Sequence, residues 1–373
     1  MVVEGKDHGS TSSTYGQGMV SLAKQPGGEN MPYSFQRGVN LGGWLSQYGR
    51  ANPRHFDTFI TEDDVSRIAS WGMDHVRLPL DYPLIEDDAH PGQYQESGLQ
   101  HIDRCVNWCQ TRGLGLILDL HRAPGYSFGT LDSNSLFDSQ EDQDRYLALW
   151  RFLARRYREV DEGLQLELLN EVVEPTSARW NTLAHRAIAA IRSVDSSRTI
   201  IFGGNHYNSV DELQNIALVP DDDHVVYTFH FYKPHLFTHQ RAGWSAISRA
   251  YNREISYPGD FPDLQAFIHH HPEFQVSQTE HQSRMDASLL QKLLEPARRF
   301  MQKTRKPLYC GEYGVIDQAP LASRINWHKH LVFLLNEMGI GHAVWSYKGM
   351  NFPLIKDDGT PVSQELIDIV ASF

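Results

Sequence analysis

The amino-acid sequence predicts a (β/α)8 barrel, the TIM-barrel architecture, with a small helical insertion between the sixth and seventh strands. From Phe35 onward, short apolar or β-branched runs alternate with amphipathic helical patterns, which is typical of parallel strands joined by helices. The chain has 373 residues, which is long enough for one barrel of eight such units. A doubly wound open sheet is the alternative, but no G-x-G-x-x-G motif follows the first run. The barrel is therefore the favoured fold.

The predicted strands and helix ends follow one another along the chain at intervals suited to strand–helix units. The strands are FQRGVNL (35–41), HVRLPL (75–80), LGLILDLH (114–121), LQLELLNE (164–171), TIIFGG (199–204), VVYTFHFY (225–232), PLYCGEYG (307–314) and HAVWSY (342–347). Thr61 precedes three acidic residues, which are favoured at the N-terminal end of a helix. Asp138 and Glu141 have the spacing of a capping box, and Gly113 is a predicted helix end.

Two segments lie outside this repeat. Residues 1–31 are rich in Gly, Ser, Thr and Gln and are predicted to be a flexible N-terminal tail, whereas residues 32–373 form one domain. The tail contains no apolar core typical of a signal peptide, so export is not supported. A signal removed from the chain is the alternative, and the localisation is unknown. Residues from about 236 to 300 exceed what a strand–helix unit needs and predict an insertion subdomain beside the barrel.

The charge and cysteine content exclude several classes of function. Lys and Arg number 34 against 46 Asp and Glu, giving a net charge of −12, which repels nucleic acid. No apolar run approaches the roughly 20 residues that span a bilayer, so no membrane contact is expected. The three cysteines are too few for a disulfide framework and lack the companions of a metal site. We expect a monomer without a metal or cofactor.

Polar or aromatic residues end nearly every predicted strand. They are Arg77, His121, Asn170, Glu171, Asn205, His230, Tyr232, Glu312 and Trp345. Any one alone has a structural interpretation: His121 as a core histidine, for example, or Arg77 as an ion-pair partner. In a barrel, however, the carboxyl ends of all strands meet at the one face where active sites form. Because so many predicted strands end in such residues, the sequence predicts an active site at this face of the barrel.

Two glutamates indicate the reaction class. Glu171 ends the fourth predicted strand and Glu312 lies at the end of the seventh, so both face the barrel mouth. Two carboxyl groups around one bond are what glycosidic hydrolysis requires: one protonates the leaving oxygen, and the other attacks the anomeric carbon or activates water. The alternative is that each is a salt-bridge partner at a strand end.

Several motifs resemble glycoside hydrolase family 5, also called cellulase family A. They are RGVNLGGWL (37–45), HVRLP (75–79), LDLHRAPG (118–125), LLNE (168–171), HFY (230–232), GEYG (311–314) and AVWSY (343–347). The resemblance extends in order and spacing from about Phe35 to the C-terminus. It implies that Glu171 is the general acid/base and Glu312 the nucleophile of a retaining double displacement.

The resemblance also implies a supporting set that holds the carboxylates and binds the sugar: Arg77, His121, Asn170, His230, Tyr232 and Trp345. Arg77 and Tyr232 would keep Glu312 ionised, and the Asn170 amide would bond the sugar 2-hydroxyl. Four more aromatic residues are candidate platforms for neighbouring sugars, with packing as the equal alternative: Trp44, Tyr48, Trp244 and Tyr347. Arg122 departs from the family pattern, which often has a small or neutral polar residue at that position.

The resulting expectation is a retaining endo-β-glucanase acting on the β-1,4 or mixed β-1,3/1,4 linkages of an oligo- or polysaccharide. An exo-β-1,3-glucanase or a β-mannanase is the alternative within the same chemistry. A metal-dependent barrel hydrolase would need ligands such as His-x-His at the end of the first strand, and GVNLGG offers none. A non-enzymatic sugar-binding barrel would usually lack one carboxylate, whereas both are present here.

Overall fold

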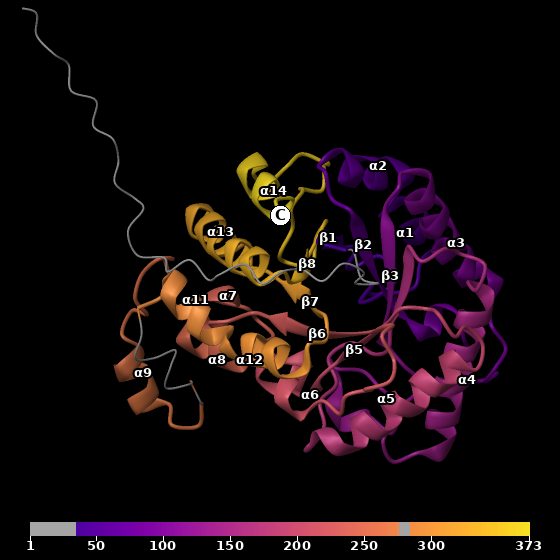
Figure 1. Ribbon diagram of the computed structural model, residues 1–373. Helices are drawn as coiled ribbons and strands as arrows, with labels where there is room; N and C mark the ends of the chain where they lie inside the picture. The colour runs from indigo at the N-terminus through magenta and orange to yellow at the C-terminus, as the bar shows by residue number, and fades with distance from the viewer. Residues whose placement is uncertain (1–34, 275, 277–283) are drawn as a thin grey trace, which may run out of the picture.

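A closed barrel of eight parallel strands, hydrogen-bonded in sequence order, forms the centre of the protein (Figure 1). The computed structural model describes residues 35–274, 276 and 284–373. The strands are β1 (Arg37–Asn40), β2 (His75–Asp81), β3 (Gly115–Arg122), β4 (Leu164–Glu167), β5 (Ile200–Gly203), β6 (Val225–Phe231), β7 (Leu308–Tyr313) and β8 (Gly341–Val344). The predicted barrel is confirmed. The predicted tail, residues 1–31, lies outside the described residues.

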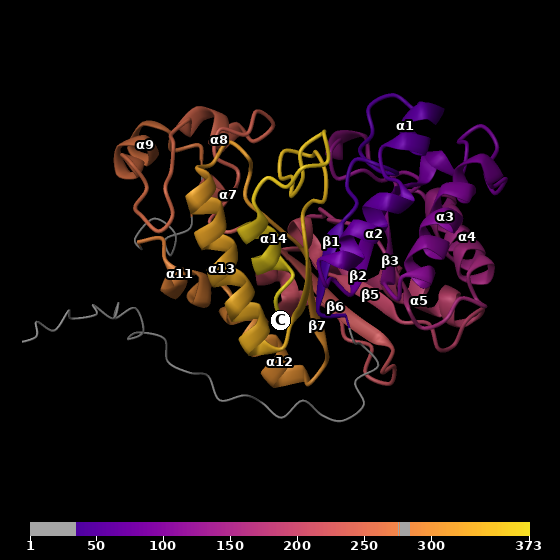
Figure 2. The same ribbon diagram turned by 90° about the horizontal axis from the view of Figure 1, so that it is seen from above.

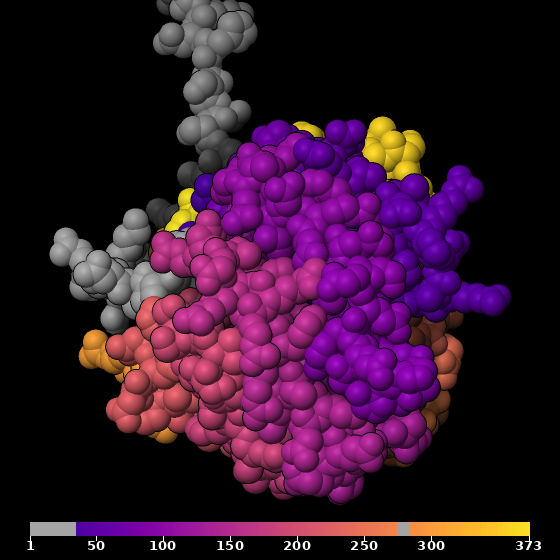
Figure 3. Space-filling model, turned by 90° about the vertical axis from the view of Figure 1, so that its right-hand side faces the viewer, coloured from indigo at the N-terminus to yellow at the C-terminus, as the bar shows by residue number. Residues whose placement is uncertain are grey.

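Helices surround the strands, as parallel sheets require because both of their faces must be covered. They are α1 (Pro53–Thr58), α2 (Glu62–Ser70), α3 (Glu96–Thr111), α4 (Gln140–Arg156), α5 (Ser177–Arg192), α6 (Asn205–Asn208), α7 (His235–Thr238), α8 (Ala246–Tyr251), α9 (Leu264–His270), α11 (Ala287–Leu293), α12 (Glu295–Thr304), α13 (Leu321–Met338) and α14 (Gln364–Val370), with short 3-10 helices at Tyr82–Leu84, Leu131–Ser133 and Val210–Asn215. Figure 3 views the side of α3 and α4, where the first half of the chain forms the surface. No helix within the described ranges combines the length and apolarity needed to cross a membrane.

The fourth strand is shorter than predicted, and this matters for the site. It ends at Glu167 rather than at Glu171. The backbone of Glu171 has φ of 37°, a left-handed conformation that an extended strand cannot contain. Glu171 therefore leaves the strand direction and reaches the barrel mouth from the loop that follows β4.

Local hydrogen bonds explain where the helices begin. At Thr61 the predicted start of α2 is confirmed, because the Thr61 N–H donates to Asp64 Oδ2 at 2.9 Å. At α4 the predicted capping residue is wrong. The cap is Ser139, whose Oγ accepts from the Asp142 N–H at 3.1 Å. The Asp138 carboxylate instead binds Arg179 at 2.6 Å, an ion pair between distant segments that sequence spacing does not reveal.

The barrel interior is packed rather than hollow. A separate cluster of six buried side chains, five of them from strands, fills it: Phe35, Ile117, Ile201, Val226, Tyr309 and Ala343. The larger apolar core lies between the strands and the helices. Because these side chains fill the interior, a site for chemistry is expected at the rim of the barrel.

The segment between β6 and β7 is helical, as predicted. Its described part contains α7, α8, α9, α11 and α12. Figure 2 shows that α8 stands at the same end of the barrel as α1, whereas α12 lies at the opposite end. Since α1 follows β1, this shared end is the one at which the strands terminate. The first part of the insertion therefore borders the rim that carries the candidate site.

Candidate active site

A buried arginine at the middle of β2 organises the barrel mouth. The Arg77 side chain is 0% exposed and contacts carboxylates from three other strands. Its Nε lies 2.7 Å from Glu167 Oε2, its Nη1 lies 2.7 Å from Glu312 Oε1, and its Nη2 lies 3.1 Å from Asp119 Oδ2. Burial lowers the pKa of the guanidinium, but these three carboxylates raise it well above its usual value. Arg77 therefore remains a fixed cation at the centre of the site.

Two amide oxygens complete the environment of this cation. Arg77 Nη1 donates to Asn40 Oδ1 at 2.9 Å, and Nη2 donates to Asn170 Oδ1 at 3.0 Å. The second bond sets the orientation of the Asn170 amide, because the oxygen faces the guanidinium and the NH2 group must point away from it. Asn170 thus directs a donor away from Arg77.

Glu312, on β7, is held by two donors. Besides the Arg77 contact, its Oε2 accepts a hydrogen bond from the Tyr232 hydroxyl at 3.0 Å. Burial is the largest effect and raises the pKa of Glu312 above its usual value, while Arg77 and the Tyr232 hydrogen bond oppose this rise. Both contacts favour the ionised carboxylate.

Glu171 has a different environment. Burial and then the charge of Glu312 raise its pKa well above the usual value. Its Oε1 lies 2.9 Å from Nδ1 of His230, and burial keeps that imidazole neutral by lowering its pKa well below the ordinary value. Glu171 has no arginine contact comparable to that of Glu312, so it is the carboxyl group that retains a proton to higher pH.

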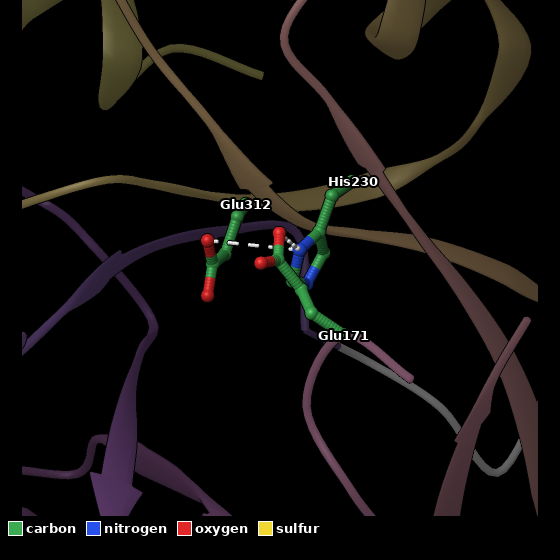
Figure 4. A group of neighbouring side chains, drawn as sticks. All are labelled: Glu171, His230 and Glu312. Carbon is green, nitrogen blue, oxygen red and sulfur yellow. Dashed lines mark hydrogen bonds and ion pairs between the residues drawn. The ribbon is translucent and has the colours of Figure 1, made fainter. Parts of the chain in front are cut away.

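The two carboxyl groups lie close together across the mouth (Figure 4). One oxygen of Glu171, one oxygen of Glu312 and one nitrogen of His230 all lie within 4.8 Å of one another. His230 Nδ1 is 3.6 Å from Glu312 Oε2, so the imidazole stands between the carboxylates. Three such groups can also hold a metal ion, but the Arg77 guanidinium lies 2.7 Å from Glu312 and its charge would oppose the binding of a divalent cation.

One wall of the site is aromatic. The Trp345 ring stacks on His121 with centroids 5.7 Å apart and an interplanar angle of 4°. His121 Nδ1 lies 2.6 Å from Asp119 Oδ2, and burial lowers its pKa to about 4, so it is neutral at ordinary pH. A Cβ at Gly42 would lie 2.7 Å from Cη2 of Trp345, so the position of the ring requires a glycine at residue 42.

Comparison with known proteins identifies the family. Residues 36–351 match the family described as Cellulase (glycosyl hydrolase family 5). The chain belongs to glycosyl hydrolase family 5. The sequence is 50% identical over 338 residues to Endoglucanase C of Acetivibrio thermocellus, a match that covers 91% of this chain and 98% of that protein. It is 36% identical over 306 residues to Cellodextrinase A of Ruminococcus flavefaciens, covering 82% and 83% of the two chains.

Solved structures agree on the fold of this family 5 protein. Cel5A of Thermotoga maritima in complex with cellobiose superposes with a TM-score of 0.72, covering 90% of this chain and 97% of Cel5A. The two sequences are 24% identical, so this likeness supports the barrel and carries no conclusion about substrate. The family predicted from the sequence motifs is confirmed.

One predicted site residue of this family 5 chain has a different place. Asn205, which follows β5, does not face the carboxylates with a free amide. Its Oδ1 accepts from the Glu174 N–H at 2.8 Å, and its Nδ2 donates to the Glu174 carbonyl at 2.8 Å. Both ends of the amide are occupied by the loop that carries Glu171. Asn205 therefore positions that loop, and its prediction as a residue of the site itself is corrected.

Sequence reasoning missed four residues that shape the site: Asn40, Asp119, Tyr126 and Glu167. Asp119 and Glu167 bind Arg77 directly, and the Tyr126 hydroxyl donates to the Glu171 carbonyl at 2.9 Å. A signal for two of them was present, since a charged residue within an apolar strand run, as in LILDLH or LQLELL, must have a buried partner. Nothing in the sequence marked Tyr126.

Two of the four candidate aromatic platforms belong to the core. Trp44 is 0% exposed, stacks on Trp108 at 6.1 Å, and donates its Nε1–H to the Phe56 carbonyl at 2.9 Å. Tyr347 is also 0% exposed and donates its hydroxyl to Asp64 Oδ1 at 2.7 Å. Neither ring offers a free face to a sugar, so both predictions are corrected.

The other two aromatic residues remain candidates. Tyr48 is partly buried and packs edge-on against Phe56 at 4.9 Å. Trp244, in the insertion, is 57% exposed. The centroid of its ring lies 6.3 Å from that of His239, and the His239 centroid lies 5.1 Å from that of Tyr232. Trp244 is therefore connected through one ring to the residue that holds Glu312.

The contrast between Trp44 and Trp244 can be tested directly. We expect Trp44→Ala to lower the free energy of unfolding by about 3–5 kcal/mol, because it empties a buried site. Trp244→Ala should change it by no more than about 0.5 kcal/mol, because the side chain is exposed. Denaturant unfolding of both variants and measurement of oligosaccharide affinity give the result. An unchanged stability in Trp44→Ala with weakened sugar binding would return Trp44 to the platform role.

Proposed function

We propose that this protein is an endo-β-glucanase that hydrolyses β-1,4 or mixed β-1,3/1,4 glucans with retention of anomeric configuration. The observation that carries the proposal is the pair Glu171 and Glu312, whose oxygens approach within 4.8 Å in opposite electrostatic environments. Retaining glycosidases hold their carboxyl groups about 5–5.5 Å apart, and inverting ones about 6.5–9.5 Å apart. The relatives named Endoglucanase C and Cellodextrinase A support a β-glucan as substrate.

In this proposal Glu312 is the nucleophile. Its ionised form, supported by Arg77 and Tyr232, attacks the anomeric carbon while Glu171 gives its proton to the leaving oxygen. The covalent bond removes the charge of Glu312. The pKa of Glu171 then falls, because that charge was one cause of its rise. Glu171 can therefore take a proton from the water that hydrolyses the intermediate.

The surrounding residues bind and orient the sugar. The outward NH2 group of Asn170 donates to the 2-hydroxyl, a contact that strengthens in the transition state. Trp345 offers an apolar face to the sugar at the cleavage site, supported from behind by His121. His230 holds Glu171 by its hydrogen bond. All of these groups come from one chain, so the proposal needs only a monomer.

Trp244 is proposed to contribute to a sugar-binding subsite at the edge of the insertion. Trp244 is exposed and precedes α8 by two residues, and Figure 2 shows α8 at the rim end of the barrel. Stacking on such a ring contributes affinity mainly through buried apolar area, at roughly 25 cal/mol per Å². Its loss should therefore affect long oligosaccharides more than short ones.

Substrate assays test the function itself. We expect reducing sugar to be released from carboxymethyl cellulose and barley β-glucan, with a rapid fall in viscosity because internal bonds are cut. EDTA should leave the rate unchanged. Preferential hydrolysis of laminarin from chain ends would support the exo-β-1,3-glucanase instead, and preferential hydrolysis of mannan would support the mannanase.

The roles of the two glutamates are tested by azide rescue. Glu312→Gln should abolish turnover, because no other group can form the glycosyl intermediate. Glu171→Ala should lose activity on glucans but retain the first step with an activated aryl leaving group, which needs little protonation. Added azide should restore its turnover and yield a β-glycosyl azide.

A nearby glutamate supplies the matched control. Glu174→Ala removes a carboxylate from the same loop, where it binds Arg179 at 3.1 Å, and azide should not change its activity. An α-glycosyl azide from Glu171→Ala would mean that the reaction inverts, contrary to the proposal.

The Tyr232 hydroxyl should set the acidic limit of activity. Its hydrogen bond lowers the pKa of Glu312, so Tyr232→Phe raises that pKa. Glu312 must be ionised to attack, and the acidic limb of kcat/KM should therefore move to higher pH, by about one unit for a hydrogen bond to a charged group.

The pH profile of kcat/KM measures this shift. Tyr157→Phe is the control, because it removes a comparable bond to the Asp103 carboxylate at 2.9 Å, among the outer helices. An acidic limb that stays in place in Tyr232→Phe would show that Arg77 alone keeps Glu312 ionised.

A further inference from the structure

A buried threonine at the start of the insertion between β6 and β7 is bonded to the backbone of Tyr232. Thr238, the last residue of α7, is 0% exposed. Its Oγ1 lies 2.6 Å from the Tyr232 carbonyl oxygen, against 3.3 Å from that of Pro234 and 3.4 Å from that of His235. The single hydroxyl hydrogen is therefore donated chiefly to the Tyr232 carbonyl. This bond ties α7 back to the residue that follows β6.

The same hydroxyl orients the ring of His239. His239 Nδ1 lies 3.0 Å from Thr238 Oγ1. Because the Thr238 hydrogen is used on the Tyr232 carbonyl, the oxygen accepts here, and the imidazole carries its proton on Nδ1. Burial lowers the pKa of His239 well below its ordinary value, so the ring is neutral and keeps this tautomer. Thr238 thus sets the orientation of the His239 ring.

The His239 ring in turn packs against the side chain of Tyr232. Their centroids lie 5.1 Å apart with the planes at 67°, the edge-to-face arrangement that aromatic pairs favour. Phe352, from the segment after β8, packs edge-on against both rings, with centroids 5.3 Å from His239 and 5.8 Å from Tyr232. The Tyr232 ring is therefore held by its backbone and by its neighbours, and Thr238 contributes to both.

Thr238 is also bonded to the chain that follows β7. Its carbonyl accepts from the N–H of Ile316, four residues beyond Glu312, at 2.9 Å. One residue therefore joins the segment that carries the Tyr232 hydroxyl to the segment that follows the Glu312 carboxylate. These two side chains share the 3.0 Å hydrogen bond from the Tyr232 hydroxyl to Glu312 Oε2. A change at Thr238 should therefore alter the geometry of that bond.

We propose that Thr238 is a positioning residue for the nucleophile, which holds the Tyr232 hydroxyl in place on the Glu312 carboxylate. It acts through Tyr232, whose hydrogen bond favours the ionised carboxylate that attacks the sugar. The insertion thereby has a part in the chemistry at the barrel mouth besides any contact with substrate. The inference rests on the proposed function, in which Glu312 is the nucleophile.

The other groups that face Glu312 are the same in every variant of Thr238. They are Arg77 on β2, Asp119 and His121 on β3, Glu171 beyond β4, His230 on β6 and Cys310 on β7 itself. A change in the ionisation of Glu312 after substitution of Thr238 is therefore assigned to the Tyr232 hydrogen bond.

Thr238→Val keeps the branched shape of the side chain and removes the hydroxyl. The acidic limb of kcat/KM should move to higher pH, by up to about one unit, the shift expected for Tyr232→Phe. 2,4-Dinitrophenyl β-cellobioside is the substrate, because its leaving group needs little protonation and the limb then reports Glu312. Thr238→Ser keeps the hydroxyl and should keep the limb in place.

Thr304→Val is the matched control. The Thr304 hydroxyl donates to the Phe300 carbonyl at 2.8 Å in α12, at the opposite end of the barrel (Figure 2), and its loss should leave the limb unmoved. Thr238→Ala removes the hydroxyl without adding a methyl group, and it takes the place of the valine variant if that variant does not fold. The double variant of Tyr232→Phe and Thr238→Val should shift no further than Tyr232→Phe alone, since it has no hydroxyl to position.

The outcomes separate this inference from the proposed function. Release of reducing sugar from β-glucan by the unaltered protein, and its loss in Glu312→Gln, test the glucanase itself. A shift in Thr238→Val that is absent in Thr238→Ser, and that adds nothing to Tyr232→Phe, supports the positioning role. An unmoved limb in Thr238→Val, a further shift in the double variant, or an equal fall in kcat/KM at every pH overturns it.

Discussion

The buried cation of Arg77 is the interaction on which the rest of the active site depends. It joins β2 to side chains of β1, β3, β4 and β7, and each contact uses a donor of fixed direction. A planar guanidinium gives such directions, which a lysine would not. The three carboxylates around it exceed its charge, and burial raises the pKa of Asp119 to about 7 in spite of Arg77. Burial and then the charge of Glu312 raise the pKa of Glu171, and among the described residues no arginine contact like that of Glu312 offsets this rise.

The proposed acid comes from a loop, yet that loop is firmly held. The Tyr126 hydroxyl donates to the Glu171 carbonyl and accepts from the Val173 N–H at 2.8 Å. Asn205 binds both backbone groups of Glu174. These bonds sustain the left-handed backbone of Glu171, a conformation that persists only where its surroundings enforce it. These bonds thus fix the position of the Glu171 carboxyl group before substrate binds, as preorganised catalysis requires.

The sequence allowed the barrel, the family and the two glutamates to be predicted, because each depends on a local pattern. Apolar runs mark buried strands, and a polar residue at the end of such a run has nowhere to lie except at the barrel mouth. The sequence could not show whether an aromatic side chain in a loop points into the core or toward the active site. Trp44 follows two glycines of a motif at the rim, yet its ring turns into the helix layer against Trp108. Contacts between residues far apart in the sequence could not be predicted either. Asp138, for example, was expected to cap a helix but forms an ion pair with Arg179.

The two histidines beside the carboxyl groups have a consequence for how protons move in this enzyme. Burial keeps His121 and His230 neutral, although imidazole is normally the side chain most ready to exchange a proton near neutral pH. Neither can compete with Glu171 for the proton released by the incoming water. In the proposed mechanism that proton therefore stays on Glu171. In that mechanism Glu171 takes up from water the proton that it gives to the next leaving oxygen, so the site returns to its starting charge after every turnover.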